Sequence, residues 1–169
     1  MSTLMAPFNL QGWIEDNRSL LKPPVGNKMI YNGGFMIMVV GGPNQRADFH
    51  VNPGEELFYQ IEGDIVLRVL DNGQRRDIPI RQGEMFLLPA GIPHSPQRPA
   101  NTVGLVVEQA RPDDADDHLC WYCPKCGALL HDAEFHLVDL GVQLKPLIET
   151  FKSSPQLRTC KQCGQVMEL

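Results

Sequence analysis

Glycine and proline interrupt the first two thirds of this 169-residue chain at intervals too short for a long helix. Short runs rich in apolar and β-branched residues lie between these interruptions, and they predict strands. The runs cover residues 35–40, 56–61, 65–70, 85–88 and 103–108. One of them leads into Asp71-Asn72-Gly73, which predicts a hairpin. Many short strands at regular spacing predict an all-β protein, an antiparallel sandwich or barrel.

Composition narrows the class of protein. Hydrophobic residues make up 43% and charged residues 21% of the chain, as in an ordinary globular protein. The formal net charge is -5 and no long basic run occurs, which disfavours binding to a nucleic-acid backbone. Residues 1–20 lack a signal-peptide pattern, and no apolar stretch reaches the roughly 20 residues that span a bilayer. We therefore expect a cytoplasmic protein with reduced thiols.

The character of the sequence changes after Arg111. An acidic stretch led by proline, residues 112–117, has the composition of a linker or a solvated loop. We expect a barrel with an N-terminal segment over residues 1–111 and a C-terminal extension over residues 112–169. Within the extension, residues 135–140 are compatible with a strand, and residues 145–152 with a short helix that has Pro146 near its start.

Two histidines and a pair of carboxylates suggest a metal site. His50 and His94 lie beside glycines and prolines, and Glu55-Glu56 follows the first histidine closely. Two imidazoles and one carboxylate on one face would leave half of an octahedral Fe(II) open for substrate and dioxygen. A single histidine near a turn, or a glutamate pair, is more often an ordinary surface feature. The spacing of these residues therefore decides between the two interpretations.

That spacing resembles the first sequence motif of the cupin superfamily. The motif consists of glycine, five residues, His-x-His, a glutamate, six residues and a second glycine. The chain supplies Gly42, His50, Glu56 and Gly63 at these positions, but Asp48 stands where the first histidine of the motif would be. The resemblance thus implies a site of two histidines and one glutamate.

The second cupin motif follows at the expected intervals. Its residues here are Gly83, Pro89, Gly91 and His94. Only Glu56 keeps the six-residue gap to Gly63, and strand alternation lets only one of Glu55 and Glu56 face inward; a slip of one residue would exchange them. The resemblance implies an all-β cupin fold, a double-stranded β-helix or jelly-roll barrel.

Three further charged residues lie close to these motifs in the sequence. Arg46 precedes His50 by four residues, and Arg98 follows His94 by four. Two guanidiniums beside one metal suit a carboxylate substrate better than a neutral one. Glu108, at the end of an apolar strand, is a candidate carboxylate inside the barrel. Surface ion pairs are the simpler interpretation of each residue taken alone.

The sequence also resembles one family, the bacterial 3-hydroxyanthranilate 3,4-dioxygenases. The matching segments are residues 6–9, 21–27, 39–44, 86–89 and 94–99, and the likeness continues from Trp121-Tyr122-Cys123 to the last Cys-Gly-Gln. It implies His50, Glu56 and His94 as catalytic Fe(II) ligands. It also implies that Arg46 and Arg98 hold the substrate carboxylate and that Glu108 bonds the polar ring substituents and handles a proton. Asn27 would belong to a loop that closes over the pocket, and the protein would be a homodimer.

The same resemblance implies the reaction. Dioxygen would open the ring of 3-hydroxyanthranilate to 2-amino-3-carboxymuconate semialdehyde, which cyclises to quinolinate, a precursor of NAD in the kynurenine pathway of tryptophan degradation. A dioxygenase acting on another aminophenol is the nearest alternative. A non-enzymatic cupin that binds or senses a small aromatic carboxylate is an alternative from another class. A sensor that uses its cysteines on nucleic acid is disfavoured by the acidic charge.

Four of the five cysteines form a separate pattern. Two Cys-x-x-Cys-Gly sequences contain Cys123 with Cys126 and Cys160 with Cys163. This spacing predicts a tetrahedral site of four thiolates, which leaves no open position and is therefore structural. A redox motif or disulfides are the alternatives, and Zn or a second Fe would suit the site equally. Cys120 lies outside both pairs and is interpreted as a spare thiol.

Overall fold

The computed structural model describes residue 4, residues 6–23 and residues 26–168. Its helical segments are α1 (Leu10–Asn17), the 3-10 helix η1 (Arg18–Leu21), α2 (Leu140–Ser153) and α3 (Pro155–Arg158). Its strands are β1 (Asn27–Asn32), β2 (Phe35–Gly41), β3 (Phe49–Val51), β4 (Glu56–Glu62), β5 (Ile65–Asp71), β6 (Gln74–Ile80), β7 (Met85–Leu88), β8 (His94–Gln97), β9 (Val103–Gln109), β10 (Asp117–Tyr122) and β11 (Leu129–Phe135).

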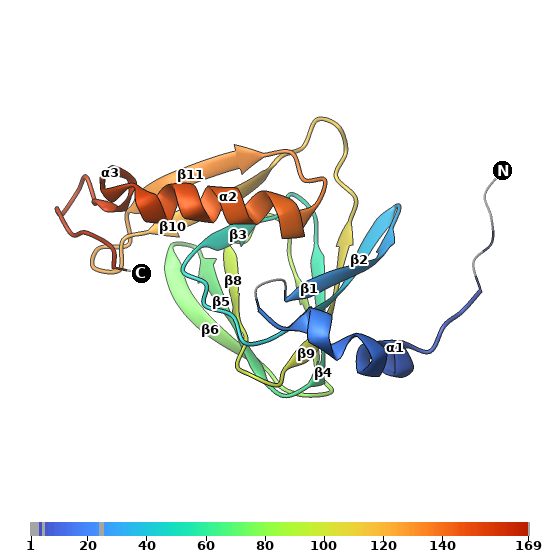
Figure 1. The fold of residues 1–169 in the computed structure, drawn as a ribbon. Helices are drawn as coiled ribbons and strands as arrows, with labels where there is room; N and C mark the ends of the chain where they lie inside the picture. The colour runs from blue at the N-terminus through green and yellow to red at the C-terminus, as the bar shows by residue number, and fades with distance from the viewer. Residues whose placement is uncertain (1–3, 5, 24–25, 169) are drawn as a thin grey trace.

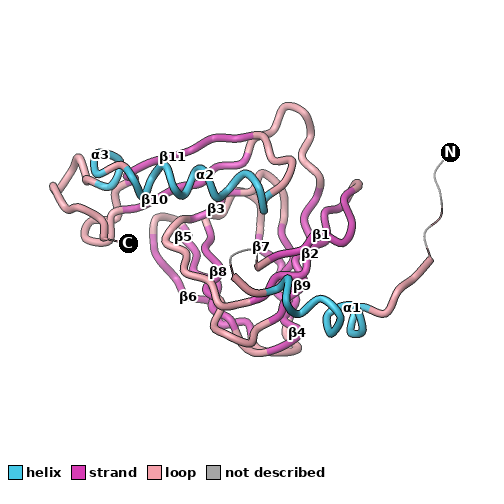
Figure 2. The backbone as a smooth tube through the Cα atoms, viewed as in Figure 1, coloured by secondary structure: helices cyan, strands magenta, loops and turns pink. Residues whose placement is uncertain are grey.

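The strands form two antiparallel sheets that face each other (Figures 1 and 2). One sheet has the order β1-β2-β9-β4-β7, and the other β11-β10-β3-β8-β5-β6. The five strands predicted from sequence are confirmed as β2, β4, β5, β7 and β9. The predicted hairpin joins β5 to β6, with positive φ at Asn72 and Gly73. Together the sheets make the cupin barrel that the two motifs imply.

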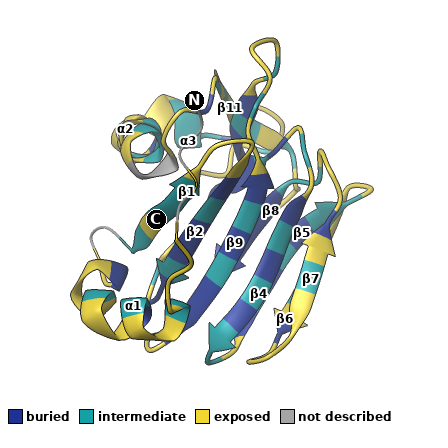
Figure 3. Cartoon of the chain, turned by 90° about the vertical axis from the view of Figure 1, so that its right-hand side faces the viewer, coloured by how far each residue is buried: buried dark blue, intermediate teal, exposed yellow. Residues whose placement is uncertain are grey.

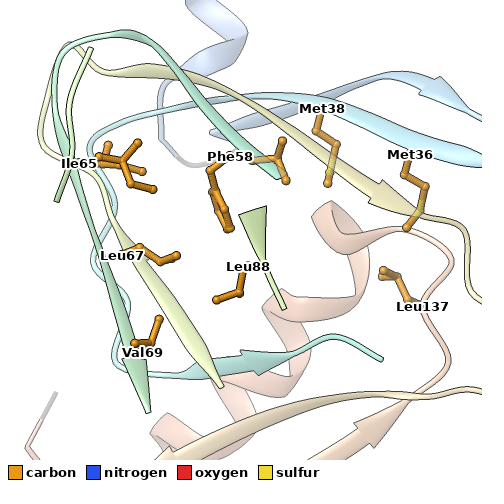
Figure 4. Packing of buried hydrophobic residues seen from close by; sticks show 10 residues of the cluster. Met36, Met38, Phe58, Ile65, Leu67, Val69, Leu88 and Leu137 are labelled. Carbon is orange, nitrogen blue, oxygen red and sulfur yellow. The ribbon is translucent and has the colours of Figure 1, made fainter. Parts of the chain in front are cut away.

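Alternation along the strands places the apolar core between the sheets. In β4 and β5 every second residue over the first five is buried, because successive side chains of a strand point to opposite faces. The main cluster combines residues of both sheets, among them Met36, Met38, Phe58, Ile65, Leu67, Val69 and Leu88 (Figure 4). These side chains support the inner faces of the strands that carry the candidate site.

The N-terminal segment covers part of the outer face of the five-stranded sheet (Figure 3). Helix α1 begins after Asn9, whose side chain accepts a hydrogen bond from the backbone N–H of Gly12 and so acts as the N-cap. This helix was not predicted from the sequence. Ile14 and Leu21 are buried with Val39 and Val103 of the sheet. The rest of this outer face, towards β7, keeps exposed apolar side chains such as Met85 and Leu87.

The C-terminal extension adds to the barrel sheet. Strand β10 pairs with β3, and β11 pairs with β10, so the sheet continues across the boundary expected between residues 111 and 112. That boundary stays a prediction. Helix α2 runs alongside β10 and β11 (Figure 1), with the buried Phe151 stacked on Trp121 at 4.3 Å between ring centroids.

Two expectations for the extension need correction. Residues 135–140 do not form a strand: β11 ends at Phe135, and Leu137 inserts into the barrel core from a loop. The predicted helix is present but begins at Leu140, so that Pro146 lies inside it. Among the described residues, no helix is long and apolar enough to cross a membrane.

Candidate active site and metal centres

The structure brings His50, Glu56 and His94 together inside the barrel. Strand pairing places His50 of β3 directly opposite His94 of β8, and Glu56 enters from the first position of β4. One possible ligand atom from each residue lies within 4.8 Å of the others, and all three residues are buried. Glu55 is exposed, so the register turns Glu56 inward.

The donor atoms of this group fit a cation. Glu56 Oε2 lies 3.0 Å from His94 Nε2, yet this buried oxygen has no hydrogen-bond partner among the described residues. His94 Nδ1 is occupied by the backbone carbonyl of Ile92 at 3.0 Å, which leaves Nε2 as the free nitrogen. A buried carboxylate oxygen and a free imidazole nitrogen that converge without a hydrogen bond are suited to share one metal ion.

The surroundings shift the ionisation of the two histidines in opposite directions. Burial opposes the charged form of both. For His50 burial dominates and lowers the pKa. For His94 the neighbouring Glu56 carboxylate outweighs burial and raises the pKa.

Asp48, the departure from the cupin motif, is paired with Arg46. Its side chain is buried and accepts hydrogen bonds from Nε of Arg46, at 2.9 Å, and from Nη2. Burial opposes the charge of Arg46, but the Asp48 carboxylate, with those of Glu56 and Glu108, outweighs burial and raises its pKa. The guanidinium therefore lies near the space between His50, Glu56, His94 and Glu108, which we call the chamber. The residue that replaces a metal ligand therefore holds an arginine beside the metal group.

Arg98 lies four residues after His94, the last residue of the second motif, and its side chain enters the chamber. It is buried, and Nη1 donates a 3.3 Å hydrogen bond to Gln60 Oε1. Burial, with the positive charge of Arg46 nearby, lowers the pKa of Arg98 to about 10, although Glu56 opposes the shift. Gly104 makes room for this contact, because a Cβ there would lie 2.9 Å from Arg98 Nη1 and 2.8 Å from Gln60 Oε1.

Glu108 reaches the chamber from β9, opposite Glu56 of β4. Burial and the Glu56 carboxylate raise the pKa of Glu108 to about 8, against the opposing effect of Arg111. The side-chain amide of Asn52 donates a 3.2 Å hydrogen bond to Glu108 Oε2. A carboxyl group with a pKa near neutrality, beside a metal group, is suited to proton transfer.

Two functional candidates went unnoticed in the sequence. Arg111 Nη2 donates to Glu108 Oε2 at 2.6 Å, and Arg111 Nε donates to Asp117 Oδ1 at 2.6 Å. Asp117 Oδ2 in turn lies 2.6 Å from His50 Nε2. These residues flank the acidic segment that resembled a linker. Their only sequence signal is an arginine and an aspartate at its two ends, which does not reveal their contacts.

A cavity of about 660 Å³ lies between α2 and the start of the barrel sheet. Its lining includes Asn27, Arg46, Leu144 and Ile148, so Arg46 is the residue it shares with the candidate site. Asn27 is the first residue of β1 and not part of a loop, which corrects the expectation. Residues 24–25, which precede it in the matching segment, lie outside the described residues.

The second cysteine pattern also converges. The Sγ atoms of Cys123 and Cys163 lie 3.6 Å apart, and those of Cys126 and Cys160 lie 3.5 Å apart. Burial opposes ionisation of Cys123, but backbone N–H groups of Cys126 and Lys125 outweigh it and lower its pKa to about 6. All four thiols are free, and the four sulfurs lie within 4.8 Å of one another. This is the donor set of a closed tetrahedral metal site.

Comparison with known proteins gives consistent matches. A family model described as 3-hydroxyanthranilic acid dioxygenase matches residues 1–152. A Neurospora crassa protein named 3-hydroxyanthranilate 3,4-dioxygenase is 53% identical over 161 residues, which cover 95% of this chain and 89% of that one. A protein of the same name from Xanthomonas euvesicatoria pv. vesicatoria is 53% identical over 163 residues, covering 96% and 93%. Among solved structures, a cupin-2 domain protein from Shewanella frigidimarina is 20% identical, with a TM-score of 0.48, covering 57% and 91%.

Proposed function

This chain belongs to the 3-hydroxyanthranilic acid dioxygenase family, and we propose that His50, Glu56 and His94 hold the metal of its reaction as iron. The protein is a metal-dependent cupin dioxygenase that opens the ring of 3-hydroxyanthranilate with dioxygen. The product, 2-amino-3-carboxymuconate semialdehyde, cyclises to quinolinate. The observation that carries the assignment of the ligands is the convergence of three buried donor groups, with Glu56 Oε2 lacking any hydrogen-bond partner in the described part of the chain.

Iron(II) suits this donor set. Two imidazoles and one carboxylate occupy one side of an octahedral ion, as in other non-haem iron oxygenases. When bound, iron supplies open coordination positions for substrate and dioxygen and a path for electrons between them. The protein contributes the rest of the chemistry, which is the orientation of an anionic aromatic substrate and the handling of its protons.

Arg46 and Arg98 are suited to hold the substrate carboxylate. The Glu56 carboxylate acts on the pKa of both guanidiniums, so both lie near it. Their fixed partners, Asp48 for Arg46 and Gln60 for Arg98, restrict their orientation before substrate arrives. Two arginines aimed at one carboxylate would set which ring edge meets the metal. Asn27, at the cavity that shares Arg46 with the candidate site, is suited to contact the substrate as it enters.

Glu108 is suited to bond the polar ring substituents and to move a proton. Its pKa of about 8 allows the carboxyl group to take up and return a proton near neutral pH. Arg111 and Asn52 both donate to Oε2, and these bonds leave Oε1 for the substrate. We assign to this oxygen the proton that the ring hydroxyl gives up on binding.

The four cysteines are proposed to hold a second metal, zinc or iron, with a structural role. All four positions of a tetrahedral ion would be filled, so no substrate could bind there. The metal would tie the turn after β10 to the chain end, next to the cluster of Trp121, Phe151 and Met167. A site of four thiolates needs reduced cysteines, which supports a cytoplasmic location.

A homodimer is proposed through the uncovered outer face of the five-stranded sheet. Strand register aligns Ile37, Val107, Leu57 and Leu87 in one row across four strands. Beside that row, Tyr59 is paired with Met85, which is 67% exposed. This face is apolar and uncharged at these positions, so a second copy related by a two-fold axis would present a matching surface.

The oligomeric state tests this interface. Leu87→Lys should convert the dimer to a monomer in sedimentation equilibrium, because a charge would be buried within the contact. Val142→Lys changes an even more exposed apolar residue, on α2, and should leave the dimer intact. Wild-type protein that sediments as a monomer would exclude the interface.

The ligand assignment is tested by anaerobic reconstitution with Fe(II), followed by 3-hydroxyanthranilate and air. We expect one dioxygen consumed per substrate and the near-ultraviolet band of the ring-opened product. His50→Ala and Glu56→Gln should lose activity and bind one iron fewer per chain than the wild type. The control Glu55→Gln, which changes an exposed neighbour, should retain the activity and the iron of the wild type. Iron bound at full stoichiometry in His50→Ala would show that the ligands lie elsewhere.

A further inference from the structure

We infer that Arg111 and Asp117 are positioning residues that lock the metal ligand His50 and the acid–base residue Glu108 into one hydrogen-bonded unit. The inference rests on the proposed roles of His50 and Glu108. It adds two residues that touch neither the metal nor the substrate and that act through those that do. The two residues lie at the ends of the segment that joins the barrel strand β9 to the first strand of the extension.

Asp117 is held from both sides. Its side chain is fully buried at the first position of β10. Arg111 Nε donates to Oδ1 at 2.6 Å, and Arg111 Nη2 donates to Oδ2 at 2.7 Å. This two-point contact fixes the plane of the carboxylate, since a guanidinium and a carboxylate match as two parallel hydrogen bonds. Oδ2 therefore has a defined position when His50 bonds to it.

Arg111 uses its remaining donors on β9. Nη2 also donates to Glu108 Oε2 at 2.6 Å, and Nη1 donates to the backbone carbonyl of Gln109 at 2.6 Å. The side chain is only 2% exposed. A buried guanidinium is costly unless it is fully paired, and here two carboxylates and a carbonyl pair it. Arg111 thus couples the position of Glu108 to that of Asp117.

The consequence for His50 is a fixed ring. Nε2 lies 2.6 Å from Asp117 Oδ2, so the hydrogen bond sets the orientation of the imidazole and leaves Nδ1 as the nitrogen for a metal. A carboxylate partner also makes the other ring nitrogen a better electron donor. His94 differs, because its second nitrogen bonds a neutral carbonyl, that of Ile92. Of the two proposed histidine ligands, only His50 has its second ring nitrogen bonded to a carboxylate, that of Asp117, which lies 67 residues away in the sequence.

The test measures Co(II) binding to metal-free barrel sites in protein whose cysteine site is filled with Zn(II). Asp117→Asn keeps the shape of the side chain but removes its charge, and Arg111→Lys keeps the charge but cannot bridge both carboxylates. We expect Asp117→Asn to weaken Co(II) binding by about 10- to 100-fold and to alter the visible Co(II) spectrum. Arg111→Lys should change both in the same direction. Arg18→Gln, which breaks an exposed ion pair with Glu15 and Glu62, should behave as wild type.

Wild-type Co(II) affinity and spectrum in both Asp117→Asn and Arg111→Lys would overturn the inference, and so would tighter binding, which would mean that Asp117 competes with the metal for His50. If Asp117→Asn fails to fold, Arg111→Lys alone decides by the same criteria. His50→Ala tests the ligand role of His50 separately from the positioning role of Arg111 and Asp117. If only His50→Ala loses Co(II) binding, the positioning role is refuted and the ligand assignment stands.

Discussion

Asp48 accepts two hydrogen bonds from the Arg46 guanidinium at the position where the first cupin motif has a histidine. The exchange of residue types changes what the position does. A histidine there would be a further metal ligand, whereas the buried aspartate fixes the orientation of an arginine suited to a carboxylate. With the proposed ligands, the aspartate would thus leave one more position of the metal open and would favour an anionic substrate.

Asp48→Asn should weaken substrate binding without removing the metal. The loss of a charged hydrogen-bond partner costs ~1.5–3 kcal/mol, which corresponds to roughly a 10- to 100-fold higher KM if Arg46 becomes mobile. Steady-state oxygen uptake and iron analysis on the same samples measure both quantities. Arg46→Ala should raise KM at least as much. A lower iron content with unchanged KM in Asp48→Asn would show that Asp48 supports metal binding and not substrate binding.

Gly104→Ala should disturb Arg98 while leaving the backbone in place. The added methyl group would lie 2.9 Å from Arg98 Nη1 and 2.8 Å from Gln60 Oε1, so the two side chains must move apart. We expect roughly a tenfold higher KM, equivalent to ~1.4 kcal/mol, with iron content unchanged. Gly34→Ala is the matched control, because a Cβ there meets nothing within 4 Å. Equal kinetics in the two variants would show that the close packing of Arg98 against Gly104 does not affect substrate binding.

The fold followed from local patterns as far as those patterns were strong. Strands such as β5 alternate cleanly between turns, and that periodicity alone locates them. Residues 135–140 misled because their apolar character has another cause: Leu137 is buried in the barrel core from a loop, whereas Val138 is exposed. Helix α1 was missed because its apolar residues are few, although Asn9 gave a capping signal.

The candidate site likewise has one part that the sequence predicts and one part that it does not. The spacing of the motif glycines predicts that His50, Glu56 and His94 converge, because it fixes turns and strand register. Arg111 and Asp117 carry no such signal. Their importance comes from the pairing of β10 with β3, segments more than 60 residues apart, and contacts of that kind depend on the whole fold. The acidic composition of residues 112–117 suggested solvent exposure, yet Asp117 is fully buried.

Glu108 should make the metal-free protein less stable as pH rises from about 5 to 8. Its pKa in the folded state, about 8, lies above the ordinary value of 4.5. Between these values the folded chain holds a proton that the unfolded chain has lost. The stability contributed by Glu108 is therefore complete below about pH 4.5 and falls by about 1.4 kcal/mol per pH unit until about pH 8.

Urea unfolding of the metal-free protein at several pH values measures this slope. Glu108→Gln cannot titrate, so its stability curve should be flatter than that of the wild type across the same window. Glu55→Gln, at an exposed carboxyl group, should reproduce the wild-type curve. Parallel curves for wild type and Glu108→Gln would mean that Arg111 keeps Glu108 ionised in the folded protein.

Cys163→Ser should remove the second metal and loosen the end of the chain. Cys163 supplies one of four sulfurs, and three thiolates bind a tetrahedral ion much less tightly than four. Elemental analysis should find one metal fewer per chain, and its identity in the wild type distinguishes zinc from iron. The melting temperature should fall because the site anchors residues next to the cluster of Trp121 and Met167.

Cys120→Ser is the control for this prediction. Its thiol is buried, bonds Asp132 and is not one of the four converging cysteines, so metal content should stay at the wild-type value. A wild-type metal content in Cys163→Ser would refute the four-sulfur site.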